Sequence, residues 1–293
     1  MSARPLPLSE AGGLTVGRFL DAAAGRLGRA GIEGARRDAR LLLAAALGLD
    51  PAQVLARPER PLSPIELDRA EAMIARRAAR EPVSRILGRR EFWGLEFAIT
   101  PAVLDPRPDS ETLVQAVLDR LDGRTAGLDI LDLGTGSGCL LLALLSDLPA
   151  ARGLGLDVSE AALGVARKNA AVLGFSARTR FEQGSWGLNL KGVWQVIVSN
   201  PPYINDQEFE GLAPEVALYD PREALAAGPD GLDAYRALLP QAVRLLAPGG
   251  LLALEVGIGQ QMMVEALVRA SGLVPLGRVR DLGGIERCLL ATC

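Results

Sequence analysis

The sequence predicts an α/β fold: a mostly parallel sheet that ends in an antiparallel hairpin, preceded by a small helical domain. Three observations lead to this prediction. Apolar residues recur at helical spacing over the first part of the chain. From residue 129, short apolar segments alternate with amphipathic ones, which is typical of a parallel sheet covered by helices on both faces. The last two apolar segments are separated only by residues 281–285, which include two glycines, so we expect them to pair as a hairpin.

Residues 1–82 are predicted to form the helical domain. The first helix should have one apolar face, made of Val16, Phe19, Leu20, Ala23 and Leu27. A second apolar segment covers 39–47. Asp50 and Ser63 are expected N-caps of two further helices, because each precedes a proline and has a Gln or Glu three residues later that can complete a capping box. The last of these helices should stop before Pro82.

Residues 83–108 are predicted to be a β-hairpin linker between two domains. Apolar residues flank Gly94 and alternate after it, as in short strands, and several prolines follow. Asp109 or Ser110 is then expected to cap the first helix of the C-terminal domain, 109–293.

The C-terminal domain should alternate strands and helices. Its expected strands are 129–133, 153–157, 178–183, 194–199, 250–256, 273–280 and 286–292. Its expected helices are 138–148, 159–173, 231–246 and 259–271.

The composition excludes several classes of protein. Of the 293 residues, 49% are hydrophobic and 23% are charged, a globular composition with no apolar run of membrane-spanning length and no secretory signal. Three cysteines without a Cys-x-x-Cys pair favour a reducing compartment, the cytoplasm. The chain has no histidine, which excludes Ser-His-Asp triads and His-ligated metals, so no metal site is expected.

Charge is distributed unevenly along the chain. Residues 1–90 hold 16 arginines and 10 acidic residues, a net charge of +6, whereas 91–293 hold 16 basic and 25 acidic residues, a net charge of −9. The basic part is either a solvated helical surface or a docking surface for an acidic or RNA-rich partner.

A glycine-rich loop follows the apolar strand at 129–133. Glycines let the backbone approach a ligand closely, and the helix that follows supplies free N–H groups. The cofactor-binding candidates in this loop are Gly134, Thr135, Gly136, Ser137 and Gly138. The next strand ends at Asp157, which can accept hydrogen bonds from a ribose diol, while Asp132 or a backbone carbonyl could accept from an ammonium group. The pattern predicts a nucleoside ligand with an amino-acid arm, such as S-adenosylmethionine; the alternative is a tight turn without a ligand.

Asn200, Pro201, Pro202 and Tyr203 follow another apolar strand, so they should lie at the same sheet edge as the glycine loop. The two prolines stiffen the backbone. The amide oxygen of Asn200 and the carbonyl of Pro201 are two fixed acceptors, which suit the two hydrogens of a planar NH₂ group. That group could be a glutamine amide or the amine of adenine. We expect Asn200, Pro201 and Tyr203 to be catalytic, and all four residues, Pro202 included, to bind the substrate.

The chain resembles the release-factor glutamine methyltransferases over nearly its whole length. The residues that carry the resemblance are Glu91-Phe92-Trp93, Pro106 to Glu111, Asp132 to Gly138, Asp157 and Val198 to Tyr203. The resemblance implies a Rossmann-like methyltransferase sheet, S-adenosylmethionine as cofactor, and as substrate the glutamine of the Gly-Gly-Gln loop of peptide chain release factors. It also implies that the N-terminal helices help to dock the factor, that Trp186 and Asn200 contact the cofactor, and that translation termination is the process served.

The sequence departs from the family pattern at one place. The family usually has an acidic residue just before the tryptophan that lies beside adenine, and this chain has Ser185 there. A serine can still hydrogen-bond to the adenine amine.

Three other functions remain open from the residues. An adenine amino-methyltransferase acting on DNA or RNA would use the same tetrapeptide, but the acidic C-terminal part argues against a nucleic-acid substrate. A binding module could keep the fold without catalysis. A nucleotide dehydrogenase would need the G-x-G-x-x-G spacing that the loop lacks.

Overall fold

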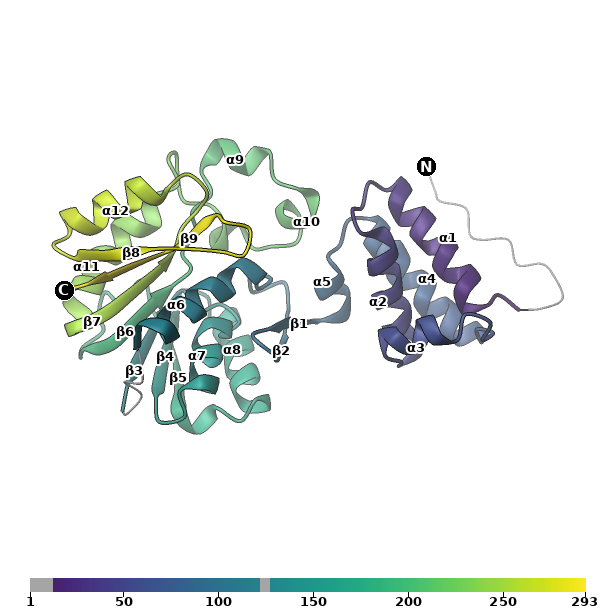
Figure 1. Cartoon of the computed structure of the whole chain (residues 1–293), viewed down its shortest axis with the longest axis horizontal. Helices are drawn as coiled ribbons and strands as arrows, with labels where there is room; N and C mark the ends of the chain where they lie inside the picture. Colours follow the sequence, from purple (N-terminus) through teal and green to yellow (C-terminus); the bar gives the residue numbers. More distant parts are fainter. Residues whose placement is uncertain (1–12, 122–126) are drawn as a thin grey trace. The chain divides into compact units, whose positions relative to one another are not determined.

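The computed structural model of the chain describes residues 13–121 and 127–293, and it divides into two compact units (Figure 1). The N-terminal unit is Met1–Leu87 and the C-terminal unit is Gly88–Cys293. The boundary falls inside the segment 83–108 that the sequence set apart as a linker. The first residues of this segment, Val83–Leu87, are helical, and the hairpin that follows belongs to the C-terminal unit.

The N-terminal unit is helical, as predicted. Its helices are α1 (Val16–Arg29), α2 (Ala35–Leu47), α3 (Pro51–Ala56), α4 (Pro64–Ala78) and α5 (Val83–Leu87). Its core holds the predicted apolar face of α1, including the fully buried Phe19 and Leu27. Both expected caps are present: the Glu66 carboxylate accepts from the Ser63 N–H at 2.9 Å, and Gln53 accepts from the Asp50 N–H at 2.9 Å.

The C-terminal unit begins with the expected hairpin, β1 (Arg89–Phe92) and β2 (Leu95–Ala98). Trp93 and Gly94 form its two-residue loop with φ of 54° and 70°. Two consecutive positive φ angles are typical of a type I′ turn, in which a glycine at the second position is the least strained residue.

A seven-stranded sheet forms the centre of the C-terminal unit, with strand order β5-β4-β3-β6-β7-β9-β8. The strands are β3 (Asp129–Leu133), β4 (Arg152–Asp157), β5 (Thr179–Gln183), β6 (Trp194–Ser199), β7 (Leu246–Glu255), β8 (Val274–Arg280) and β9 (Glu286–Thr292). Strands β3 to β7 pair in parallel, and β9 is antiparallel to both β7 and β8. The predicted sheet and its final hairpin are confirmed.

Helices cover both faces of this sheet (Figure 1). On one face α6 (Glu111–Leu121), α7 (Cys139–Asp147) and α8 (Glu160–Val172) contribute to a core that includes Ile130 and Val196. On the other, α11 (Asp233–Leu245) and α12 (Gln261–Ala270) contribute to a core that includes Leu131 and Ile197. Consecutive strand residues therefore enter opposite cores, which explains why the middle of β6, Val196 to Val198, is apolar on both faces.

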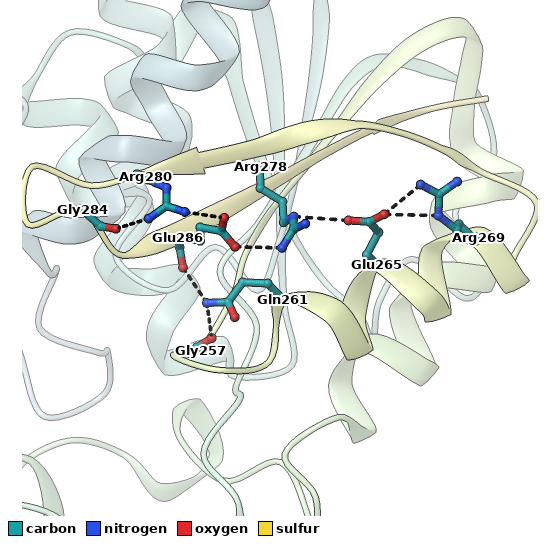
Figure 2. A network of polar contacts seen from close by, with 8 residues as sticks. All are labelled: Gly257, Gln261, Glu265, Arg269, Arg278, Arg280, Gly284 and Glu286. Carbon is teal, nitrogen blue, oxygen red and sulfur yellow. Dashed lines mark hydrogen bonds and ion pairs between the residues drawn. The ribbon is translucent and has the colours of Figure 1, made fainter.

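The C-terminal hairpin is tied to α12 by charged side chains (Figure 2). Arg278 in β8 forms ion pairs with Glu286 in β9 at 2.9 Å and with Glu265 in α12 at 3.4 Å. Arg269 contacts the same Glu265 carboxylate at 2.8 Å. A linked set of ion pairs of this kind holds the edge of the sheet against its covering helix.

Two local predictions were wrong. Strand β7 begins at Leu246, not at 250, because Leu246 pairs with Trp194 ahead of a register shift in β6. Asp109 and Ser110 do not cap a helix; they lie in the 3₁₀ turn η1 (Pro108–Ser110), and α6 begins at Glu111. The sequence also gave no prediction of the short elements α9 (Asp206–Glu210), α10 (Pro214–Ala217), η2 (Ser176–Arg178) and η3 (Arg222–Ala224).

Within residues 13–121 and 127–293, no helix combines the length and the apolar character that crossing a membrane requires.

Candidate active site

A cavity of about 510 Å³ opens at the carboxyl ends of β3, β4 and β6 in the C-terminal unit. The predicted residues that line it are Gly134, Thr135, Gly136, Ser137, Asp157, Trp186, Asn200 and Pro202. Residues far apart in the sequence thus meet at one edge of the sheet, where ligands bind in open α/β folds.

The glycine loop turns sharply between β3 and α7. Gly134, Gly136 and Gly138 have φ of 78°, 54° and 82°, a region that residues with a Cβ rarely adopt. The N–H groups of Gly134 and Thr135 donate to the carbonyl of Leu156 at 2.9 and 2.8 Å, which fastens the loop to β4. Gly138 is the N-cap residue of α7. It is not one of the described residues that line the cavity.

Asp157 fixes the rim of the cavity at the end of β4. Its two carboxylate oxygens accept from the N–H of Gly136 and the N–H of Ser159, each at 2.9 Å. A carboxylate has acceptor sites beyond these two. Asp157 can therefore hold the glycine loop in place and still accept hydrogen bonds from a hydroxyl group in the cavity.

Asp132 lies beneath the glycine loop and is fully buried. The hydroxyl of Thr135 donates to its Oδ2 at 2.7 Å, and its Oδ1 has no hydrogen-bond partner among the described residues. Burial raises the pKa of Asp132 to about 7; the hydrogen bond from Thr135 opposes this shift and the nearby charge of Asp157 adds to it. The unpaired oxygen is a spare acceptor under the loop.

Trp186 forms another wall of the cavity. Its backbone has φ of 51°, and its ring lies so close to Gly134 that a Cβ there would come within 3.7 Å. Ser185, beside it, is exposed and is absent from the described residues that line the cavity. The ring and the glycine loop both line the cavity, and an aromatic face suits a planar base.

Asn200 stands where two cavities adjoin. It lines the large cavity and also a smaller one of about 180 Å³, which Tyr203 lines as well. The amide Nδ2 of Asn200 donates to Oγ of Ser110 at 3.2 Å. Because Nδ2 is held in this way, Oδ1 remains as an acceptor. Pro201 is buried and, within the described part of the chain, lines neither cavity.

Behind Tyr203 lies a buried acid, Glu255, at the end of β7. The Tyr203 hydroxyl donates to its Oε1 at 3.4 Å, and Tyr235 donates to its backbone carbonyl at 2.8 Å. Burial raises the pKa of Glu255 to about 7, while the Ser110 hydroxyl and the charge of Arg287 lower it.

The comparisons with known proteins agree with this architecture. The PrmC N-terminal domain matches residues 19–88, and a methyltransferase domain matches residues 124–266. The release factor glutamine methyltransferase of Rhodospirillum rubrum is 52% identical over 97% of this chain and 86% of its own length. That of Cereibacter sphaeroides is 46% identical over 93% of this chain and 96% of its own.

The chain belongs to the release factor glutamine methyltransferase family. The resemblance and the enzyme class expected from the sequence are confirmed, and membership supports S-adenosylmethionine as the cofactor. Solved structures agree in fold: a methyltransferase from Pyrococcus furiosus superposes with a TM-score of 0.51 at 18% identity, over 76% of this chain and 96% of that one. The hMettl16 catalytic domain gives 0.55 at 18% identity, over 75% and 81%.

The structure adds site residues in this family member to which the sequence assigned no role. Arg107 lines both cavities and forms an ion pair with the buried Asp220 at 2.5 Å. Ser110 contacts Asn200 and lines the large cavity. Both Arg107 and Ser110 lie in the segment Pro106 to Glu111 that carries the family resemblance. Their place in this segment was the one feature of the sequence that could have indicated a role in the site. Nothing in the sequence pointed to Asp220.

Proposed function

We propose that this protein transfers a methyl group from S-adenosylmethionine to the side-chain amide nitrogen of the glutamine in the Gly-Gly-Gln motif of peptide chain release factors. The observation that carries the proposal is Asn200, whose Oδ1 is left as an acceptor between the two cavities. The names of the relatives support this choice of substrate.

The residues around the large cavity fit the cofactor. A volume of about 510 Å³ lies within the range of small-molecule sites. Asp157 would accept from the ribose, Trp186 would lie beside the adenine, and the glycine loop, beneath which Asp132 is buried, would admit the amino-acid arm. When bound, S-adenosylmethionine supplies a methyl group already activated by the positive sulfur.

The chain's own groups then orient the acceptor nitrogen. Oδ1 of Asn200 and the carbonyl of Pro201 would each accept one hydrogen of the substrate NH₂, which fixes the plane of the amide. The two prolines keep these acceptors rigid, and Tyr203 would wall the smaller cavity against which the substrate side chain lies. Positioning and electrostatics of this kind lower the barrier, and the methylated nitrogen can lose its proton to water without a histidine base.

The proposal also covers the role of the N-terminal unit, the protein partner and the cellular process. The helical unit, with its excess of arginines, would help to dock the release factor. The reaction would serve translation termination in the cytoplasm.

A methylation assay tests the proposed function. Purified protein, labelled S-adenosylmethionine and a release factor should place label on one glutamine, and a factor with that glutamine changed to alanine should accept none. Asn200→Ala should lower turnover by orders of magnitude while the protein stays folded. Salt-sensitive labelling of DNA or RNA, with no label on the factor, would overturn the substrate and favour an adenine amino-methyltransferase.

A further inference from the structure

The smaller cavity beside Asn200 has a mostly apolar lining. Its apolar residues are Leu104, Ile204, Leu212, Val216, Ala224 and Leu225. The described residues with polar side chains that line it are Arg107, Asn200 and Tyr203. An amide group that enters such a cavity leaves water, so each of its polar atoms needs a hydrogen-bond partner from the protein.

The two ends of a glutamine amide need opposite partners. Its NH₂ group needs acceptors, and its carbonyl oxygen needs a donor. The Tyr203 hydroxyl already donates to Glu255 at 3.4 Å, and Nδ2 of Asn200 donates one hydrogen to Ser110 at 3.2 Å. Arg107 has the most donors left, because its guanidinium carries five N–H bonds and the hydrogen bond to Asp220 uses one of them.

Arg107 also lies where the two cavities adjoin. Four residues line both cavities, and they are Leu104, Arg107, Asn200 and Ala224. A methyl group from a cofactor in the large cavity and a side chain in the smaller one have to meet at this junction. Of these four residues, Arg107 and Asn200 have polar side chains, so the junction combines a set of donors with an acceptor.

Asp220, in the turn between α10 and η3, holds Arg107 in this place. Its side chain is only 1% exposed, and its Oδ2 accepts from Nη2 of Arg107 at 2.5 Å. Its Oδ1 accepts from the N–H of Asp105 at 3.3 Å, which fixes the carboxylate against the segment that carries Arg107. The negative charge of Asp220 also offsets the positive charge of Arg107. A guanidinium without such a partner would bind a carboxylate more strongly than an amide.

We propose that Arg107 donates to the side-chain carbonyl oxygen of the substrate glutamine, and that Asp220 is a positioning residue that orients Arg107 and offsets its charge. The inference rests on the proposed function, because it concerns how the same site recognises its substrate. The consequence is selection of an amide over a carboxylate. A glutamate would place a negative oxygen against the acceptors of Asn200 and Pro201, and it would gain little from an arginine that is already paired.

A release factor whose target glutamine is changed to alanine separates contact with the amide from docking of the factor. Arg107→Met should lower kcat/KM for the natural factor at least tenfold. The Ki of the alanine factor as a competitive inhibitor, and the affinity for S-adenosylhomocysteine, should stay within twofold of wild type. Arg107→Lys keeps a donor without the planar fork and should recover part of kcat/KM. The matched control is Arg236→Met, which breaks an exposed ion pair with Asp230 and should leave kcat/KM unchanged.

A factor whose target glutamine is changed to glutamate tests Asp220, and it decides the matter if Arg107→Met does not fold. Asp220→Asn keeps the shape of the side chain and one acceptor oxygen but removes the charge that offsets Arg107. The glutamate factor should then inhibit about tenfold more strongly than it inhibits wild type, and added salt should reduce the gain. The alanine factor should inhibit both proteins equally, whereas a purely structural loss would weaken both factors together. The gain should vanish in the double variant Arg107→Met with Asp220→Asn, and the matched control Asp230→Asn should show none.

The outcomes separate this proposal from the proposed function. Wild-type protein that leaves the glutamine unmethylated overturns the proposed function itself. If wild type is active, a folded Arg107→Met variant that keeps the wild-type kcat/KM, or that loses affinity for the alanine factor to the same extent, overturns the contact with the amide. An Asp220→Asn variant that binds the glutamate factor no more tightly than wild type overturns the role of Asp220. Both of these results leave the proposed function standing.

Discussion

At the scale of single residues, hydrogen bonds to the protein hold the polar side chains of the site in place. Both oxygens of Asp157 hold backbone N–H groups, and the Nδ2 of Asn200 holds Ser110. Both residues line the cavity, and each has acceptor capacity beyond these contacts. A ligand therefore meets groups whose orientation was fixed before it arrived, which reduces the entropy lost on binding.

Asp157→Asn should weaken the binding of S-adenosylhomocysteine about tenfold or more. Asparagine has one acceptor oxygen, so it cannot accept from both Gly136 and Ser159, and it loses the charge-assisted bond to a ribose hydroxyl, worth about 1.5–3 kcal/mol. Titration calorimetry measures the change. Asp129→Asn, an exposed residue at the other end of β3, is the control and should bind as wild type. Unchanged affinity of Asp157→Asn would remove Asp157 from the cofactor site.

At the scale of elements, the sequence predicted what local patterns determine and missed what distant contacts determine. Three strands match their predicted bounds, because each is built on a short apolar segment that is visible in the local sequence. The start of β7 was missed, since Leu246 joins the sheet only through pairing with Trp194. In the site, the glycine loop and the tetrapeptide were visible as local motifs. The partnership of Arg107 with Asp220 spans 113 residues, and no local pattern signals it.

Two glycines in the C-terminal unit should respond to alanine with opposite signs. A Cβ would meet nothing within 4 Å at Gly94 or at Gly164, so packing does not distinguish them. Gly94 has φ of 70° in the hairpin loop, where alanine should destabilise by about 1 kcal/mol. Gly164 is a helical residue of α8, where alanine should stabilise by about 0.5–1 kcal/mol. Urea unfolding measures both, and a shift of the same sign in the two variants would contradict the type I′ loop.

At the scale of the whole molecule, each unit has its own hydrophobic core, and their unfolding can be followed separately. All three tryptophans, Trp93, Trp186 and Trp194, belong to the C-terminal unit. Tryptophan fluorescence therefore reports the unit that contains the candidate active site. That unit also holds both buried acids whose pKa is raised to about 7, Asp132 and Glu255.

These two acids should make the C-terminal unit less stable as the pH rises through neutrality. Their usual pKa values are 3.8 and 4.5, so the folded state binds their protons more tightly than the unfolded state does. The resulting stabilisation is complete below about pH 4 and is lost as the pH rises through about 7. Asp230 and Asp281, whose pKa values are lowered, change stability only in the acid range below this window.

Urea unfolding followed by tryptophan fluorescence at pH 5, 6, 7 and 8 measures the effect without any ligand. Wild-type protein should lose a few kcal/mol of unfolding free energy across this range. The double variant Asp132→Asn with Glu255→Gln should lose much less, because its amides do not titrate. The control is the double variant Asp129→Asn with Glu265→Gln. It replaces two acids that are not fully buried, and it should follow the wild-type slope. Equal slopes in wild type and in the first double variant would mean that neither buried acid keeps its proton at neutral pH.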